Sequence, residues 1–201
     1  MNQPEFSLTQ LLRRLVGADV DFVVIGGVAV IVQASPRFTK DLDICYATEQ
    51  ANLDRLGGAL VELGARLRGV EEDLPFVPDG PALRRAHMLT LTTREGDIDL
   101  LADPAGSPGY APLRRNVSRV DLDGVTVLVA SVEDMIAMKR AAGRPQDLVD
   151  LESLEIARRR VRRGHPRLDQ GAASAPAGPS VGPATWRELR YDPARRPLRG
   201  R

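Results

Sequence analysis

Residues 21–47 read DFVVIGGVAVIVQASPRFTKDLDICYA and carry most of the information on how this chain folds. The first five, 21–25, form a short apolar run rich in β-branched residues, which predicts a buried strand. Gly26 and Gly27 interrupt that strand. Residues 28–34 are apolar on every side and predict a short buried helix that starts at the glycines. After a turn, residues 41–47 form a second predicted strand.

The second strand carries two carboxylates, Asp41 and Asp43. Because side chains alternate along a strand, both carboxylates share one face with Cys45, while Leu42 and Ile44 take the opposite face and can enter a core. Two like charges on one face repel each other unless a cation lies between them, and Mg²⁺ prefers oxygen ligands of this kind. The pair therefore predicts a metal site, with a solvated strand end as the alternative.

A second Asp-x-Asp, Asp97 and Asp99, lies in the sequence GDIDLL of residues 96–101. If that strand neighbours the first, a third carboxylate joins the group, and three carboxylates can hold two cations for a phosphoryl transfer. Gly26 and Gly27 supply free backbone N–H groups that a phosphate can approach without meeting a Cβ. A plain turn is the alternative interpretation of the glycine pair.

The rest of the chain predicts an α+β fold, with a mixed β-sheet flanked by helices and a C-terminal pair of helices. Further helices are predicted at residues 8–17, 49–63, 131–142 and 146–163, further strands at 88–93, 97–101, 120–122 and 125–129, and loops at 71–85 and 103–110. We expect one folded domain at residues 1–163. Residues 164–201, rich in Pro, Ala and Arg, predict a flexible, disordered tail.

The composition of the chain indicates where in the cell it is expected to be. The single cysteine, Cys45, excludes an internal disulfide and fits a reducing cytoplasm. No run of eighteen apolar residues and no secretory signal is visible, so we expect a cytoplasmic protein without a membrane partner. Residues 158–201 hold twelve arginines against three acidic residues, a net charge of +9. Such a tail can bind RNA, or it can be a solvated tail.

Residues 25–30 and 37–44 resemble the polymerase-beta-like nucleotidyltransferase superfamily, and most closely its small bacterial members related to the AbiEii-type toxins of type IV toxin–antitoxin systems. Residues 96–101 are similar to the strand that carries that family's third carboxylate, which favours Asp99 over Asp97 as the metal ligand. Residues 131–151 resemble the family's C-terminal signature, with Lys139 as a landmark.

The resemblance implies a nucleotidyltransferase of EC 2.7.7 type that uses an NTP and two Mg²⁺ ions, with Mn²⁺ as an alternative. Asp41, Asp43 and Asp99 are the expected catalytic and metal-binding residues, and Gly26 and Gly27 the expected nucleotide-binding pair. Lys139 joins that pair because an ammonium suits a triphosphate, although an ordinary exposed lysine explains it equally well. The expected supporting residues are Thr39, Lys40, Arg144, Asp147 and Asp150.

Asp147 and Asp150 are three residues apart and share one helix face, where they can pair with Lys139 or Arg144 for structural or functional reasons.

These expectations combine into a metal-dependent transfer of a nucleoside monophosphate from an NTP to an acceptor hydroxyl. The acceptor is an RNA end, a protein or a small molecule, with tRNA as the first guess, and a cognate antitoxin is an expected partner. One alternative is a non-catalytic binding or regulatory module on the same fold. Another is an RNA-interacting protein that acts through its basic tail.

Overall fold

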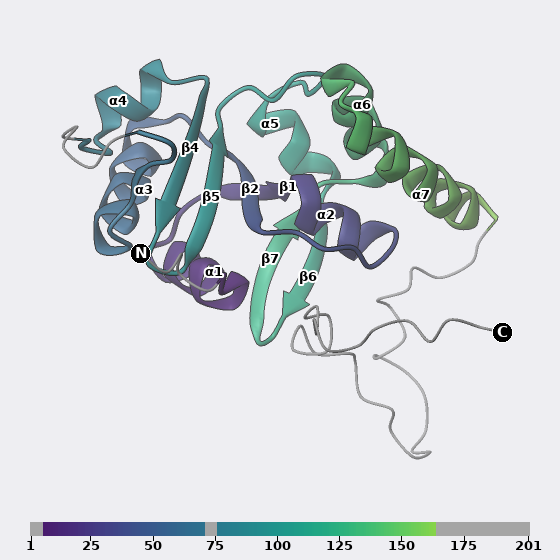
Figure 1. The fold of residues 1–201 in the computed structure, drawn as a ribbon, viewed down its shortest axis with the longest axis horizontal. Coiled ribbons are helices and arrows are strands. Elements are labelled where there is room, and N and C mark those ends of the chain that lie inside the picture. Colours follow the sequence, from purple (N-terminus) through teal and green to yellow (C-terminus); the bar gives the residue numbers. More distant parts are fainter. Residues whose placement is uncertain (1–5, 71–75, 164–201) are drawn as a thin grey trace, which may run out of the picture.

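The computed structural model describes residues 6–70 and 76–163, which form a seven-stranded sheet with helices packed against it (Figure 1). The strands follow the order β3-β4-β5-β2-β1-β7-β6. Their bounds are β1 Phe22–Ile25, β2 Asp41–Tyr46, β3 Arg66–Leu67, β4 Met88–Thr93, β5 Gly96–Leu101, β6 Ser118–Leu122 and β7 Val125–Val129. The pairs β2–β5 and β1–β7 are parallel and the other pairs antiparallel, so the predicted mixed sheet and α+β class are confirmed.

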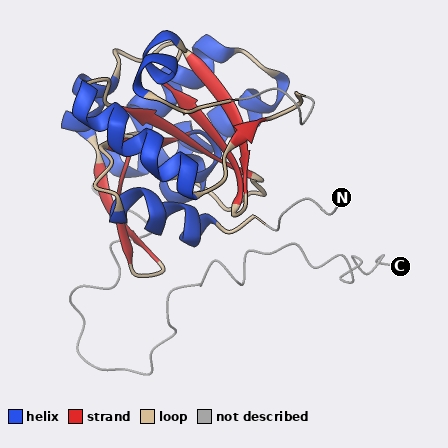
Figure 2. Cartoon of the chain, turned by 90° about the vertical axis from the view of Figure 1, so that its left-hand side faces the viewer, coloured by secondary structure: helices blue, strands red, loops and turns tan. Residues whose placement is uncertain are grey.

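Helices lie on both sides of the sheet (Figure 2). Their bounds are α1 Leu8–Gly17, α2 Gly26–Gln33, α3 Gln50–Glu62, α4 Gly80–Arg85, α5 Tyr110–Leu113, the 3₁₀ turn η1 Arg114–Asn116, α6 Val132–Ala142 and α7 Pro145–Arg162. The predicted C-terminal pair, α6 and α7, pack against each other, and both contact α2. The C-terminal helices are thereby brought to the side of the sheet where the glycine pair begins α2.

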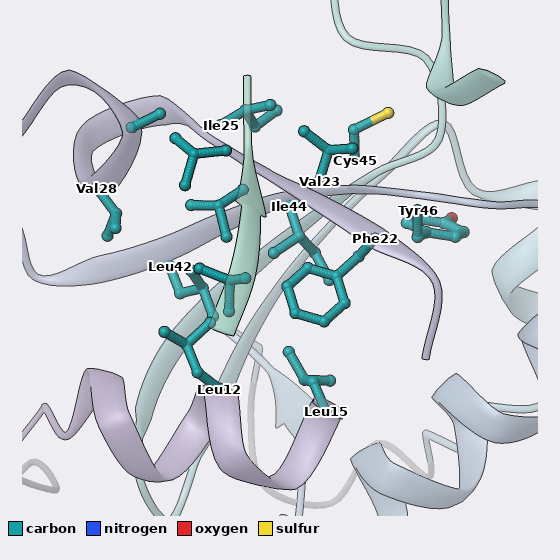
Figure 3. Packing of buried hydrophobic residues seen from close by; sticks show 14 of the residues in the cluster. Leu12, Leu15, Phe22, Val23, Ile25, Val28, Leu42, Ile44, Cys45 and Tyr46 are labelled. Atoms are coloured by element: carbon teal, nitrogen blue, oxygen red, sulfur yellow. The ribbon is translucent and has the colours of Figure 1, made fainter. Parts of the chain in front are cut away.

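One face of the central strands packs on α1. Figure 3 shows Leu12 and Leu15 of α1 beneath Phe22, Leu42 and Ile44. The four leucine and isoleucine side chains of this group are fully buried. Burial of each such side chain stabilises the fold by roughly 1.5–3 kcal/mol, so this contact fixes which face of β2 is apolar. The predicted alternation along β2 is confirmed, and its aspartates lie on the face away from α1.

The structure corrects several predicted boundaries. Residues 80–85, placed in the predicted loop 71–85, form α4, because the Asp79 carboxylate accepts a hydrogen bond from the Ala82 N–H and caps the helix. Pro81 stands in the first turn, where a missing N–H costs nothing, and Leu83 is fully buried. The prolines favoured a loop in the sequence analysis. A proline breaks a helix only in the helix interior, however, and is tolerated in the first turn.

Other differences are short. The two-residue strand β3 and the α5–η1 turn were not predicted, since neither is long enough to show a period. Helix α2 starts at Gly26 itself, and β6 starts at Ser118. The predicted tail, residues 164–201, lies outside the described residues. Among the described residues, no helix combines the length and apolar character needed to cross a membrane.

Candidate active site

The carboxylates meet across the parallel pair β2–β5. In this register Asp41 is opposite Asp97, and Asp43 is opposite Asp99. Since side chains alternate on both strands, the four carboxylates share the face of the sheet that is turned away from α1. The expected adjacency of a third carboxylate is therefore present in the fold.

Burial makes two members of this cluster, Asp43 and Asp99, costly to ionise. Burial raises the pKa of Asp43, and repulsion from Asp41 raises it further. Burial is also the main reason that the pKa of Asp99 rises to about 6, with Asp43 and Asp41 adding to the effect and Arg68 opposing it. Carboxylates in such surroundings favour a bound cation, and their oxygens are ligands suited to Mg²⁺ or Mn²⁺.

The oxygens are not arranged as a finished metal site. In the described part of the chain, no three acidic, histidine or cysteine side chains are placed closely enough to hold a metal ion as they stand. A guanidinium takes up part of the cluster instead. Arg68 Nη2 lies 2.7 Å from Asp99 Oδ1, and Arg68 Nη1 lies 3.1 Å from Asp97 Oδ2. The chemistry of the donors fits a divalent ion, and Arg68 occupies an oxygen of Asp99 that such an ion would use.

The glycine pair leaves space for the Asp43 side chain, because neither residue has a Cβ. Gly26 has a φ of 60°, and a Cβ at this position would lie 1.9 Å from Asp43 Oδ2. The Gly27 N–H donates a hydrogen bond of 3.3 Å to the same oxygen. The carboxylate therefore lies against the first turn of α2, where unpaired backbone N–H groups favour an anion.

Thr39 holds the other end of the cluster. Its hydroxyl donates to Asp41 Oδ1 at 3.2 Å, and a Cβ on Gly27 would lie 2.4 Å from that hydroxyl oxygen. Lys40 is exposed to solvent. Gly27 is thus required by the close approach of Thr39, a reason that differs from the phosphate contact predicted from sequence.

A buried ion network stands beside the glycines. The Lys139 ammonium lies 2.9 Å from Asp147 Oδ1 and 2.7 Å from Asp150 Oδ2, and all three residues are buried. The expected pairing of the two carboxylates with Lys139 is confirmed, and Lys139 is not the exposed lysine of the alternative interpretation. Its role as a direct nucleotide ligand stays a prediction, and its ammonium already has two carboxylate partners.

Two arginines extend this network toward the cluster. Arg144 Nε lies 3.0 Å from Asp147 Oδ2, and Arg37 Nη1 lies 3.2 Å from Asp150 Oδ1. Burial opposes ionisation of Asp147, but hydrogen bonds from Arg144 and Lys139 outweigh it and lower the pKa of Asp147 to about 2. A Cβ on Gly27 would lie 2.7 Å from Arg37 Nη2, which places this guanidinium beside the start of α2.

Sequence reasoning missed Arg37 and Arg68 as parts of the site. Arg37 stands four residues before Asp41, and its position within the quoted stretch could have marked it. Arg68 follows the two-residue strand β3 and belongs to no motif, so only the pairing of β3 with β4 and of β4 with β5 brings it to the carboxylates.

Among the solved structures similar to this chain, one superposes well enough to show a shared fold. The lincosamide antibiotic adenylyltransferase LnuA, solved with lincomycin bound, is 15% identical, covers 75% of this chain and 98% of its own, and superposes with a TM-score of 0.52. The antibiotic-resistance factor ANT(2'')-Ia is 15% identical over 77% of this chain and 91% of its own, with a TM-score of 0.47. A putative nucleotidyltransferase from Thermotoga maritima, TM1012, is 16% identical over 78% and 91%, with a TM-score of 0.44.

No curated protein sequence matches this chain. The family description "Nucleotidyl transferase AbiEii toxin, Type IV TA system" matches residues 10–158, which include the carboxylate cluster, the glycine pair and the buried ion network. The match spans most of the chain, and the resemblance predicted from sequence is confirmed. The chain belongs to the AbiEii family of nucleotidyltransferase toxins of type IV toxin–antitoxin systems.

Proposed function

We propose that this chain is a metal-dependent nucleotidyltransferase that transfers a nucleoside monophosphate from an NTP to an acceptor hydroxyl. The observation that carries the proposal is the register of β2 and β5, which sets Asp43 beside Asp99 at the start of α2. Phosphoryl transfer needs little covalent chemistry from a protein and depends on positioning and on charge stabilisation. Divalent ions held by a carboxylate pair next to a helix N-terminus would supply both.

Asp41, Asp43 and Asp99 would hold the divalent ions, with Mg²⁺ as the expected metal and Mn²⁺ as a substitute. Bound there, such ions supply Lewis-acid stabilisation of the charge on the attacking and leaving oxygens. Thr39 and Gly27 keep Asp41 and Asp43 in place through the contacts described above. Binding of an ion would require these carboxylates to close around it and Arg68 to release Asp99.

The NTP phosphates would lie at Gly26 and Gly27, where the first N–H groups of α2 and the Arg37 guanidinium meet. The acceptor oxygen forms a bond to the α-phosphorus while the bond to the bridging oxygen breaks and pyrophosphate leaves. The acceptor proton passes to the Asp99 carboxylate. A carboxylate next to the acceptor hydroxyl can take up its proton as a general base.

Lys139 has a different part in this proposal from the one expected from sequence. Its ammonium neutralises Asp147 and Asp150, which in turn hold Arg144 and Arg37. Lys139 is thus a positioning residue that sets two guanidinium groups near the phosphates. Arg144 also attracts Asp43 electrostatically, which links the network to the carboxylate cluster.

The family of the chain supports a toxin role and an antitoxin partner. The acceptor is proposed as RNA, with tRNA first, and a protein or a small molecule is the alternative. The names of the structural relatives mention antibiotics, but at 15% identity those relatives share only the fold with this chain. Growth arrest on expression, relieved by the product of a neighbouring gene, is the expected cellular behaviour.

The test is nucleotide transfer by the purified full chain. Each of the four NTPs, labelled at the α-phosphate, is incubated with Mg²⁺ and with total cellular RNA, cellular protein or an aminoglycoside in separate reactions. We expect label in the RNA fraction and no label with Asp43→Asn. Label in another fraction would change the acceptor, and no transfer to any fraction with any NTP would overturn the proposal.

A further inference from the structure

Arg68 lies among the carboxylates that the proposed function assigns to metal ions. Its guanidinium contacts Asp99 at 2.7 Å and Asp97 at 3.1 Å, and Arg68 Nη1 is 4.0 Å from Asp41 Oδ2. The nearest of these contacts is to Asp99, which is expected to bind metal. A guanidinium carries one positive charge in a planar fork suited to carboxylates, so it can replace part of the charge that a divalent ion would bring.

We propose that Arg68 is the internal counter-ion of the carboxylate cluster, and that a divalent cation binds by displacing its guanidinium from Asp99. The inference rests on the proposed function, since it assumes that Asp99 is a metal ligand. Beyond that function, we infer that the Arg68 side chain lowers the affinity of the chain for the metal ion.

Asp97 can keep the guanidinium bound after it leaves Asp99. The two contacts use different nitrogens of Arg68, so the contact to Asp99 can be lost while the contact to Asp97 remains. Asp97 is itself held by the Thr92 hydroxyl, which donates to Asp97 Oδ1 at 2.8 Å. This arrangement also gives separate roles to the two aspartates of β5, with Asp99 for the metal and Asp97 for the arginine.

The backbone of Arg68 is bound to β4, while its side chain is partly exposed to solvent. The Arg68 N–H donates to the Thr90 carbonyl at 2.9 Å, which ties the residue to β4. The side chain is 31% exposed, whereas that of Asp99 is 9% exposed. The arginine can therefore move toward solvent at lower cost than the aspartate, and it is the partner that yields when a cation arrives.

The inference is tested by Mn²⁺ binding to the full chain without nucleotide, measured by calorimetry and by the loss of the free Mn²⁺ signal in electron paramagnetic resonance. We expect Arg68→Gln to bind Mn²⁺ about three to ten times more tightly than the unaltered chain, because one partly exposed charged contact no longer competes. Arg119→Gln, on the exposed side of β6, makes the same change in net charge and is expected to leave Mn²⁺ binding unchanged.

Arg68→Lys provides a second variant that keeps the charge but loses the fork geometry. Its Mn²⁺ affinity is expected to fall between those of the unaltered chain and Arg68→Gln, and it serves alone if Arg68→Gln does not fold. Equal or weaker Mn²⁺ binding by the folded variants would overturn the inference while leaving the proposed function standing. If no chain binds Mn²⁺, even with a non-hydrolysable ATP analogue present, both the inference and the proposed function fail.

Discussion

Asp43 and Asp99 are register partners on the adjacent parallel strands β2 and β5. Between these strands the chain forms α3, β3, α4 and β4, so two distant segments each supply one carboxylate. The parallel pairing is central to the site, because a register shift of one residue would turn one carboxylate toward the apolar core. The same pairing sets Asp41 opposite Asp97, which gives a matched pair of positions for mutagenesis.

The two aspartates of β5 should differ in their effect on catalysis. We expect Asp99→Asn to lower nucleotide transfer by at least about a hundredfold, because a ligand of the metal ions is lost. Asp97→Asn, which weakens the anchor of Arg68 and changes the contact with the Thr92 hydroxyl, should cost no more than about tenfold. Transfer rates at saturating Mg²⁺ and NTP measure the difference, and equal losses for the two variants would argue against the assignment of Asp99.

Gly26→Ala should disrupt the site through sterics. The added Cβ would lie 1.9 Å from Asp43 Oδ2, at a residue with positive φ, so the carboxylate or the start of α2 must move. We expect a loss of about 1–3 kcal/mol in the free energy of unfolding, together with loss of transfer.

Gly58→Ala is the matched control for this substitution. Gly58 lies within α3 and has open space around its would-be Cβ, so alanine there should raise stability by roughly 0.5–1 kcal/mol. Urea denaturation of both variants gives the comparison. A Gly26→Ala protein as stable and active as the unaltered chain would contradict the proposed crowding at Asp43.

Lys139→Met should be strongly destabilising. The substitution leaves Asp147 and Asp150 buried with one cation fewer, and an uncompensated buried charge costs about 3–5 kcal/mol. Arg140→Met, on the next residue, removes only an exposed pair with Glu155 and should cost less than about 1 kcal/mol. Thermal or urea unfolding measures both. Similar costs for the two variants would mean that the buried network contributes little to folding.

Asp147 should make the protein sensitive to acid. Its pKa is lowered from 3.8 to about 2, so its ion pairs stabilise the fold fully above pH 4 and are lost as the pH falls from about 4 to 2. This loss corresponds to about 2 kcal/mol of unfolding free energy. Asp147→Asn should lack this part of the pH dependence, whereas Glu152→Gln, an exposed substitution on the same helix, should retain it. Urea titrations at pH 6 and pH 3, between which roughly half of this loss is expected, test the point, and an unchanged pH dependence in Asp147→Asn would refute it.

The sequence was sufficient where the chain repeats a strong local pattern. The apolar run of β1, the glycine pair and the alternation of Asp41, Leu42 and Asp43 have short-range causes, and each was predicted within one or two residues. The pairing of β2 with β5 was expected only conditionally, because strand order depends on contacts between distant segments. Arg68 was missed for the same reason, since nothing near it in the sequence marks its partners.

The status of Lys139 shows a different limit. Its spacing from Met135 predicted a helix position correctly, but a helical period does not tell whether a lysine faces solvent or two carboxylates from the next helix. Helix α4 was not predicted, because its proline was taken as a loop signal without regard to its position in the first turn of the helix. In both cases the missing information was tertiary, a partner or a cap supplied by a neighbouring segment.

The parallel pairing of β2 with β5 also determines when the carboxylate cluster can form in a newly made chain. The two strands are far apart in the sequence, and closing so large a loop is among the slower steps in folding. A chain emerging from the ribosome therefore carries Asp41 and Asp43 well before Asp99 can join them. The carboxylate cluster is therefore completed late, and only in molecules whose strands β2 and β5 have already paired.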